Sequence, residues 1–316
     1  MTVLALDLGA SRVRTAVVLD DGTLAGRRTA RTPRPLAELV DRCAHELRLS
    51  LAAARDHGAS DPTALSISAP GPLDPRRGIF LDPPNLDPSL WRFPLAARLG
   101  EELGLPALLE RDTQVAALGE GAFGAARGLT DYVYLTVSTG VGGAIVSDGR
   151  LLRGPDGLAG ELGHMTIDVN GPVCGCGARG HLEALASGTG IVNAARAAGR
   201  EIETASQVAA HEEAGEPWAH EIMERARQAF AAAAVSIVDV FNPQRIIVGG
   251  GVAAGQGERL LGPARAAVKR HAFRGQAERV EIVPAQLGDD VGLIGGLALV
   301  GLARMGDHGY LHNDAT

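Results

Sequence analysis

The chain has 316 residues, of which 46% are hydrophobic and 21% are charged, and its formal net charge at pH 7 is -7. This length exceeds the usual size of one hydrophobic core, so we expect two domains or one large α/β unit. The acidic balance, with a pI near 5.7, offers no general basic surface and argues against a nucleic-acid-binding protein.

The first segment of the chain has no basic leader, and its apolar run is broken at Asp7. No stretch of eighteen uncharged apolar residues occurs, which argues against a membrane span. Cys174 and Cys176 are too close for an ordinary disulfide framework, and three cysteines are an odd count. We therefore expect a cytoplasmic protein, in which Cys43 is a small buried residue of a helix.

Two segments, residues 4–22 and 133–149, have the same pattern. Each reads as an apolar strand, a polar Gly-rich turn, a second apolar strand and an Asp-Gly pair that favours a tight turn. Backbone N–H groups in a glycine-rich turn can approach an anion closely, so two such hairpins could hold a polyphosphate from two sides. On turn composition alone, two ordinary β-hairpins explain the pattern equally well.

The remaining segments alternate between strand and helix patterns, which predicts an α/β fold. In chain order we expect a helix at 36–57, a strand at 63–68, a helix near 94–104, a strand at 106–112, a helix at 113–123, mostly helix over 186–241, a strand and Gly-rich turn at 245–255, a strand at 280–285 and a last helix at 292–304.

The Gly-rich stretch at 163–183 predicts a metal site. His164, Cys174, Cys176 and His181 have the spacing H-x9-C-x-C-x4-H, and nitrogen and sulfur are the ligands that zinc prefers. The alternative, four unligated surface residues, is hard to sustain for two cysteines separated by one residue. Because all four ligand positions are taken, we expect structural rather than catalytic zinc.

Two acidic residues follow predicted strands. Asp7 precedes a glycine-rich turn, where its carboxylate could hold Mg²⁺ or the waters of that ion. Asp112 precedes a helix and suits either a general base or a helix cap, and the cap is the simpler interpretation for Asp112 alone.

Three familiar nucleotide or hydrolase motifs are excluded. Residues 245–254 could pass for a dinucleotide fingerprint, but Lys269 and Arg270 stand about where an acid is required. The sequence contains neither the P-loop pattern G-x-x-x-x-G-K-[ST] nor the G-x-S-x-G pattern of a nucleophile elbow.

Taken in order, the segments ALDLGASRVRTAVV, SISAPGPLD, ERDTQVAALGE, STGVGGAIVSDGRLLRG, AGELGHM, CGCGARGHLEALASG and NPQRIIVGGGV resemble the ROK family of bacterial sugar kinases and related repressors. The resemblance covers nearly the whole chain. It implies an α/β, actin-like ATPase (ribonuclease H-like) fold of two lobes around a central cleft. Residues 1–112 and about 292–316 would form the smaller lobe, and residues 113–291 the larger lobe with the zinc knuckle.

The resemblance also implies an activity, which is transfer of the γ-phosphoryl group of Mg-ATP to a hexose hydroxyl, commonly O6. Glucose is the simplest acceptor, with an epimer, an amino sugar or a cyclitol as alternatives. The expected partners are this sugar and a second copy or copies of the chain in a homodimer or homotetramer, with no nucleic acid and no membrane.

The family's functional residues map onto this sequence by motif. Asp112 matches the general base. The residues expected to bind ATP and Mg²⁺ are Asp7, Gly9, Ser11, Thr139, Gly140, Gly142, Gly249, Gly250 and Gly251. The residues expected to bind the sugar are Gly71, Asn85, Arg111, Asp112, Glu161, His164 and Glu183. His164 would bind zinc through one ring nitrogen and face the sugar with the other.

Two positions depart from the family's pattern. His181 replaces a cysteine, which still satisfies zinc but changes the reach of the ligand. Arg111 replaces a sugar-contacting asparagine, and an arginine only donates hydrogen bonds and carries a charge, so sugar preference should change. Arg111 could also hold Asp112 more strongly ionised and make it a weaker base.

Two other functions within this family are alternatives to the kinase. A sugar-sensing repressor of this family would carry a helix-turn-helix before the first phosphate motif, which here begins at Leu4. A catalytically silent sugar-binding relative is suggested by Arg111, but Asp7, Asp112 and the complete glycine turns favour the kinase.

Overall fold

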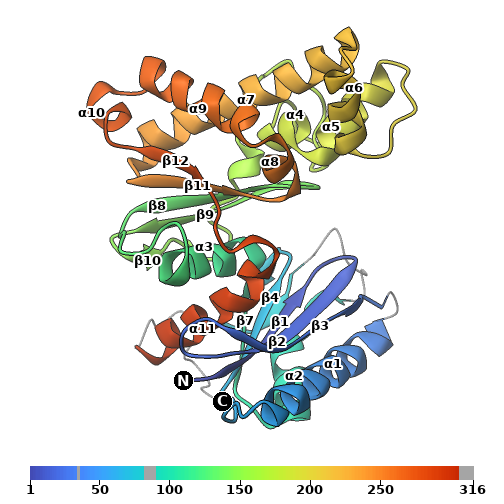
Figure 1. Ribbon diagram of the computed structural model, residues 1–316, viewed down its shortest axis with the longest axis vertical. Coiled ribbons are helices and arrows are strands. Elements are labelled where there is room, and N and C mark those ends of the chain that lie inside the picture. Colours follow the sequence, from blue (N-terminus) through green and yellow to red (C-terminus); the bar gives the residue numbers. More distant parts are fainter. Residues whose placement is uncertain (34–35, 82–89, 306–316) are drawn as a thin grey trace. The chain divides into compact units, whose positions relative to one another are not determined.

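The computed structural model describes residues 1–33, 36–81 and 90–305. The chain divides into two compact units (Figure 1). Unit 1 comprises Met1–Arg127, Arg153–Ala159 and Asp289–Thr316, the last of these described as far as residue 305. Unit 2 comprises Gly128–Leu152 and Gly160–Gly288.

Unit 1 is an α/β unit. Its strands are β1 (Val3–Leu8), β2 (Arg12–Val18), β3 (Leu24–Arg31), β4 (Leu65–Ala69), β5 (Leu73–Asp74), β6 (Ile79–Phe80) and β7 (Ala107–Arg111). Its helices are α1 (Leu36–Asp56), α2 (Leu95–Leu103), α3 (Asp112–Phe123) and α11 (Val291–Arg304), and the 3-10 turn η3 (Gly288–Asp290) leads into α11.

The main sheet of unit 1 has the strand order β3-β2-β1-β4-β7. The strands β1, β4 and β7 are parallel, so their carboxyl ends meet at one edge of the sheet. At that edge Asp7 is paired in register with Ser68, and Ser68 with Glu110. Ligands of open α/β sheets bind at this edge, and the residues expected to be catalytic lie there.

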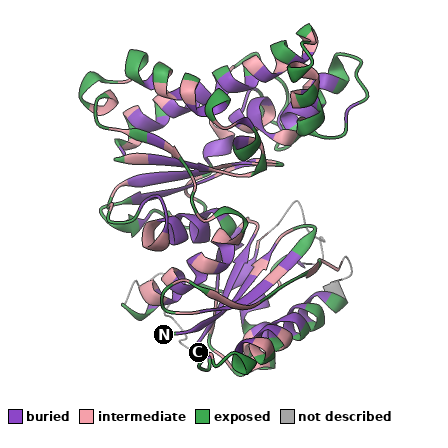
Figure 2. Ribbon diagram, viewed as in Figure 1, coloured by how far each residue is buried: buried purple, intermediate pink, exposed green. Residues whose placement is uncertain are grey.

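The alternation of side chains along β1 explains how unit 1 is layered. Leu4, Leu6 and Leu8 face the core formed with α1 and α2, whereas Val3 and Ala5 face the core formed with α11. All five residues are almost completely buried, and the central strands of this sheet have the colour of buried residues in Figure 2. The central strand is therefore apolar on both faces, as in other parallel sheets covered by helices.

Unit 2 contains the remaining elements. Its strands are β8 (Tyr132–Val137), β9 (Val141–Ser147), β10 (Arg150–Leu151), β11 (Arg245–Gly249) and β12 (Glu281–Pro284). Its helices are η2 (Leu162–His164), α4 (Leu182–Ala186), α5 (Gly188–Ala197), α6 (Ala205–Glu213), α7 (Pro217–Phe241), α8 (Gly251–Gln256), α9 (Glu258–His271) and α10 (Arg274–Ala277), where η2 is a 3-10 turn.

The two units repeat one sheet topology. The sheet of unit 2 has the order β10-β9-β8-β11-β12, in which β8 and β9 are antiparallel and β8, β11 and β12 are parallel. This is the arrangement of β3-β2-β1-β4-β7 in unit 1. The prediction that residues 4–22 and 133–149 form two equivalent hairpins is confirmed, and Asp148 and Gly149 both have the positive φ that a tight two-residue turn requires.

Candidate nucleotide and sugar site with a cysteine-histidine cluster

The first glycine-rich turn joins β1 to β2 and carries Gly9 and Ser11. The backbone N–H of Gly9 donates to the carbonyl of Arg12 at 2.9 Å, and a Cβ on Gly9 would lie 3.2 Å from the same oxygen. The turn is therefore too tight for a larger residue at this position without displacement of its neighbour. Ser11 is exposed, so the outer part of the turn is accessible to a ligand.

Asp7 lies just before this turn and is held by two side chains. Arg14 Nη1 donates to its Oδ2 at 2.8 Å, and Ser68 Oγ donates to its Oδ1 at 3.1 Å. Burial raises the pKa of Asp7, and the Arg14 guanidinium opposes that rise. A Cβ on Gly292 would come within 2.8 Å of the carboxylate, so the start of α11 lies against it.

The second glycine-rich turn joins β8 to β9 and carries Thr139, Gly140 and Gly142. The backbone N–H of Ser138 donates to the carbonyl of Gly140 at 2.9 Å and closes the turn. The hydroxyl of Thr189, in the first turn of α5, donates to the carbonyl of Thr139 at 2.8 Å. The turn is thereby fixed beside the N-terminus of α5, where a helix dipole favours anions.

A third turn, Gly249 to Gly251, joins β11 to α8 and touches the end of β8. Gly250 has a φ of 92°, and a Cβ there would lie 2.5 Å from the carbonyl oxygen of Val137 and 2.7 Å from Thr136 Oγ1. Only glycine fits this conformation and this approach. The second and third turns therefore lie side by side, although they are far apart in the sequence.

A cavity of about 640 Å³ lies within unit 2 where these two turns meet α5, α6, α7 and α8. Its volume is in the range of small-molecule sites. Thr139 and Gly251, both expected to bind nucleotide, belong to its lining. The lining also includes polar or flexible residues that were not predicted from the sequence: Asn193, Glu203, Glu213, Met223 and Gln256. These residues lie on or next to helices, where their spacing is that of ordinary helical faces, so the sequence contained no signal for them.

Asp112 occupies the junction between β7 and α3 in unit 1. The helix begins at Asp112, one residue earlier than expected, and Arg111 is at the N-cap position without a side-chain capping bond. Asp112 Oδ1 accepts from the backbone N–H of Thr113 at 2.7 Å. Asp112 is exposed, so its carboxylate combines the anchorage of a helix N-terminus with access to a ligand.

Arg111 has a buried side chain, since the residue is only 3% exposed. Its Nη2 donates to the carbonyl of Ala159 at 3.0 Å. A Cβ on Gly71 would lie 3.0 Å from Arg111 Cδ, so the arginine stem passes directly beside Gly71. These contacts direct the side chain towards Ala159.

The neighbouring Glu110 is completely buried and accepts from Arg153 Nε at 3.0 Å. The two side chains at the end of β7 therefore hold both ends of the segment Arg153–Ala159, through Arg153 and through Ala159. A hydrogen bond between a buried carboxylate and a guanidinium is stronger than one between neutral groups.

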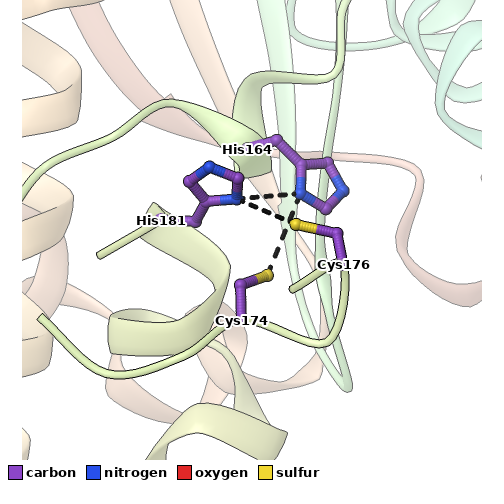
Figure 3. Close-up of side chains that lie close together, drawn as sticks. All are labelled: His164, Cys174, Cys176 and His181. Carbon is purple, nitrogen blue, oxygen red and sulfur yellow. Dashed lines mark hydrogen bonds between the residues drawn. The ribbon is translucent and has the colours of Figure 1, made fainter. Parts of the chain in front are cut away.

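The predicted metal ligands gather in one cluster of unit 2, the knuckle formed by His164, Cys174, Cys176 and His181 (Figure 3). Their ligand atoms all lie within 4.8 Å of one another. His164 Nδ1 lies 3.2 Å from His181 Nδ1, and Cys176 Sγ lies 3.3 Å from His181 Nδ1. Cys174 Sγ lies 3.9 Å from His164 Nδ1.

These spacings suit a tetrahedral zinc ion. Zinc–nitrogen bonds of about 2.05 Å and zinc–sulfur bonds of about 2.3 Å place two nitrogens roughly 3.3 Å apart and a nitrogen and a sulfur roughly 3.6 Å apart. The three distances given above, 3.2, 3.3 and 3.9 Å, are within about 0.4 Å of these values, and both histidines contribute Nδ1 to them. The residues therefore fit the metal in number, in chemistry and in arrangement.

Glu183 connects the knuckle to the second turn. Its Oε2 accepts from the backbone N–H of Val141 at 3.0 Å, and Cys174 Sγ donates to its Oε1 at 3.7 Å. A Cβ on Gly140 would lie 2.5 Å from Glu183 Oε2, so the carboxylate is packed against the turn. Glu161 immediately precedes η2 and is exposed.

The expected site residues thus fall into two groups. In unit 1, Asp7, Gly9, Ser11, Gly71, Arg111 and Asp112 lie at or near the carboxyl edge of the sheet. In unit 2, the second and third turns adjoin the cavity, and the knuckle with Glu183 adjoins the second turn. Asn85, expected to contact the sugar, lies outside the described residues.

Comparison with known proteins identifies the family. A sequence model of the ROK family matches residues 3–302. The chain belongs to the ROK family. N-acetylmannosamine kinase of Escherichia coli O157:H7 is 35% identical over 302 residues, which cover 95% of this chain and 98% of that enzyme.

Two solved structures extend the similarity to the fold. A ROK hexokinase from Thermus thermophilus is 35% identical with a TM-score of 0.85, and the match covers 97% of this chain and 100% of that one. A ROK glucokinase from Streptomyces griseus, solved with glucose and AMPPNP, is 30% identical with a TM-score of 0.77, again over 97% and 100% of the two chains. The predicted actin-like ATPase fold is confirmed by these ROK structures and by the repeated sheets.

Within the described ranges, every helix is either too short or too polar to span a bilayer.

Proposed function

We propose that this ROK protein is an ATP-dependent sugar kinase that transfers the γ-phosphoryl group of Mg-ATP to a hydroxyl of a hexose. The observation that carries the proposal is 30–35% identity to named sugar kinases along nearly the entire chain. The ROK glucokinase solved with glucose and AMPPNP supports ATP as the donor and a hexose as the acceptor. The preferred acceptor hydroxyl is O6 of glucose, N-acetylmannosamine or a related sugar.

The glycine-rich turns would bind the phosphates. Backbone N–H groups around Gly9 and around Thr139, Gly140 and Gly142 can donate to phosphate oxygens without the desolvation of a side chain. The buried carboxylate of Asp7, aligned by Arg14 and Ser68, has the chemistry to hold Mg²⁺ or its waters. The magnesium ion would neutralise charge that develops on the transferred group.

Asp112 would act as the general base. Its carboxylate accepts from the N–H of Thr113 at 2.7 Å, which orients it, and Asp112 is exposed, so a sugar hydroxyl can approach the carboxylate. Removal of the hydroxyl proton as the oxygen attacks the γ-phosphorus contributes typically 10²–10⁴-fold to such reactions. The remaining catalysis comes from positioning and charge neutralisation.

Glu161, His164 and Glu183 are the proposed sugar contacts of unit 2. Carboxylates and an imidazole accept hydrogen bonds from several hydroxyls at fixed angles, and a sugar without one of those hydroxyls would leave a polar group unpaired. If His164 binds zinc through Nδ1, its Nε2 is the nitrogen that can face the sugar. Gly71 would supply backbone next to the sugar, where a side chain would collide with Arg111.

We further propose that the knuckle holds one structural Zn²⁺ with His164, Cys174, Cys176 and His181 as ligands. The ion would fasten the loop that leads into α4 and thereby fix Glu183. This role requires no open coordination position, in agreement with four protein ligands.

The proposed assembly is a homodimer or homotetramer, which sedimentation equilibrium tests directly.

The test is ADP release from Mg-ATP across a panel of hexoses, N-acetylated and free amino sugars and cyclitols. We expect turnover with at least one member and none without an acceptor. Asp112→Asn should lose on the order of a hundredfold or more in kcat while sugar affinity is retained. The matched control is Asp61→Asn, which removes an exposed carboxylate from a surface pair with Arg55 and should leave kcat unchanged.

The outcome distinguishes the kinase from its alternatives. Sugar binding measured by calorimetry, without ADP release for any member of the panel, would show that the protein is a sugar sensor and not a kinase. Full activity of Asp112→Asn would show that this carboxylate is only part of the helix start.

A further inference from the structure

The 640 Å³ cavity of unit 2 is bordered, at Gln256, by a polar network that extends to Arg227, Glu212 and Glu224. Gln256, the last residue of α8, lines the cavity and is 8% exposed. Its Oε1 accepts from Arg227 Nη1 at 3.0 Å. Arg227 lies on α7 and is 5% exposed, so the contact is buried.

Arg227 is itself fixed by two carboxylates. Its Nη2 and Nη1 donate to the two oxygens of Glu212 at 2.5 Å and 3.2 Å, and its Nε donates to Glu224 Oε2 at 3.1 Å. A paired arrangement of this kind between guanidinium and carboxylate is both strong and directional. The position of Nη1 opposite Gln256 is therefore set by helices α6 and α7.

This network determines which end of the Gln256 amide faces the cavity. A guanidinium has only donors, so the amide must turn its oxygen towards Arg227. The amide nitrogen, with two N–H donors, is then the end available to a ligand.

The distribution of charge in the cavity indicates which part of a nucleotide lies near Gln256. The hydroxyls and backbone of the second turn and the N-terminus of α5 form one part of the lining, which suits phosphates. Glu203 and Glu213, next to or on α6, form another part together with Arg196, whose Nε donates to the carbonyl of Ile202. With two carboxylates and one guanidinium, this part has a net negative charge and would disfavour a polyphosphate. Gln256 is connected to α6 through Arg227 and Glu212, so it belongs to the part that suits the uncharged base.

We propose that Gln256 is a specificity-determining residue that donates an amide N–H to a ring nitrogen of the adenine, and that Arg227 is the positioning residue that fixes this donor. The inference rests on the proposed use of ATP. Adenine offers N1, N3 and N7 as acceptors, and the donor at Gln256 matches any one of them. The residue would thereby orient the nucleoside relative to the glycine-rich turns.

The first test is ATP binding by titration calorimetry, without sugar, to the full chain and to two variants. Gln256→Met keeps the length of the side chain but has no donor, and we expect about fivefold to tenfold weaker ATP binding, the effect of one lost hydrogen bond. Gln256→Glu still accepts from Arg227 but presents an oxygen to the ring nitrogen. We expect ATP to bind to this variant more weakly than to Gln256→Met, while the thermal midpoint stays at or above that of the unmodified chain.

The second test compares 1-deaza-, 3-deaza- and 7-deaza-ATP. In the unmodified chain, one analogue should bind about fivefold to tenfold more weakly than ATP, and in Gln256→Met that difference should disappear. Glu278→Gln, which changes an exposed carboxylate of a surface pair with Arg274 and does not line the cavity, serves as the control and should bind ATP within twofold of the unmodified chain.

The results separate this inference from the proposed kinase. Unchanged ATP affinity of Gln256→Glu would overturn the role of Gln256 even if the protein is a kinase. The same holds if a deaza-ATP analogue binds to Gln256→Met as much more weakly than ATP as it does to the unmodified chain. Absence of ATP binding to the unmodified chain would instead remove the nucleotide on which both proposals depend.

Discussion

The backbone N–H of Val141 donates to Glu183 Oε2 at 3.0 Å, so one carboxylate links the second glycine-rich turn to the helix that follows the knuckle. The other oxygen of the same carboxylate accepts from the Cys174 thiol at 3.7 Å, a bond that zinc would replace because the thiolate is the metal ligand. Glu183 follows the proposed ligand His181 by two positions, so a shift of the knuckle would still move the turn proposed to bind phosphate. Glu183 connects the proposed zinc site to the proposed nucleotide site as well as being a candidate sugar contact.

The first prediction concerns this link. Glu183→Ala should lower the free energy of unfolding by about 1–3 kcal/mol, because the N–H of Val141 loses its acceptor in a part-buried position. It should also raise the KM for ATP together with that for sugar. Glu183→Gln keeps an acceptor for Val141 and should preserve stability and the KM for ATP while it changes the KM for sugar. Urea unfolding and steady-state kinetics check these values, and equal behaviour of the two variants would show that the bond to Val141 has no such role.

The second prediction concerns metal content. Elemental analysis should find about one zinc per chain, since two thiols and two imidazoles complete a tetrahedral set. Cys174→Ser and Cys176→Ser should each lose most of the zinc and become less stable. Cys43→Ser is the matched control, because Cys43 is buried in the core of unit 1 and burial raises the pKa of its thiol to about 12. A folded, active preparation without zinc would contradict the proposal that a zinc ion fixes this loop.

The third prediction concerns pH. Burial raises the pKa of Asp7 above its ordinary value of 3.8, so the folded protein holds this proton more tightly than the unfolded chain does. Ionisation of Asp7 therefore reduces stability as pH rises from about 3.8 through the folded-state pKa. Asp7→Asn cannot ionise, and Arg14 is partly exposed, so solvent can compensate for the lost partner. The variant should gain stability relative to the unmodified chain across this window while it loses turnover with Mg-ATP.

Unfolding in urea at several pH values between about 4 and 7 measures this difference. Asp21→Asn provides a control, because the N–H of Thr23 lowers the pKa of the exposed Asp21. Because the folded-state pKa of Asp21 lies below 3.8, its ionisation adds stability mainly below that pH, so the relative stability of this variant should stay nearly constant over the pH range in which that of Asp7→Asn rises. A difference for Asp7→Asn that does not change with pH would show that ionisation of Asp7 carries no cost in the folded protein.

The local parts of the structure could be predicted because their causes lie in short stretches of sequence. The turn at Asp148 and Gly149 needs two positive φ angles, and the Asp-Gly pair predicts this turn because both residue types adopt positive φ more readily than others. The knuckle depends on residues close together in the chain, since His181 follows Cys176 by five positions and both thiols lie within one loop. The two hairpins of equal pattern, β1-β2 and β8-β9, were predicted, whereas the strand orders of the two sheets were not.

Other features could not be predicted because they depend on contacts between distant segments. Nothing near Gln256 in the sequence indicates that Arg227, on another helix, sets the orientation of its amide. The bond between Val141 and Glu183 joins positions 42 residues apart. The start of α3 at Asp112 rather than Thr113 also escaped prediction, because either acid or hydroxyl could have capped the helix.

The last prediction concerns Arg111, where the family pattern has an asparagine. Its guanidinium donates to the carbonyl of Ala159 and its stem lies against Gly71, so it both fills space at the end of β7 and holds the segment Arg153–Ala159. Arg111→Asn removes this anchor and places an amide, which donates and accepts, where the arginine stem had been. We expect the set of accepted sugars to broaden or shift, with at least a fivefold change in relative kcat/KM between two sugars.

Arg111→Lys tests whether Arg111 acts through its hydrogen bond to Ala159 or through the shape that its side chain gives the site. Lysine keeps the charge and can still reach a carbonyl, but it lacks the planar fork of the guanidinium. If Arg111 acts through Ala159, the sugar profile of this variant should remain close to that of the unmodified chain and only its stability should fall. If both variants keep the original profile on the full sugar panel, Arg111 has no part in selecting the acceptor, and the replacement of asparagine affects the fold alone.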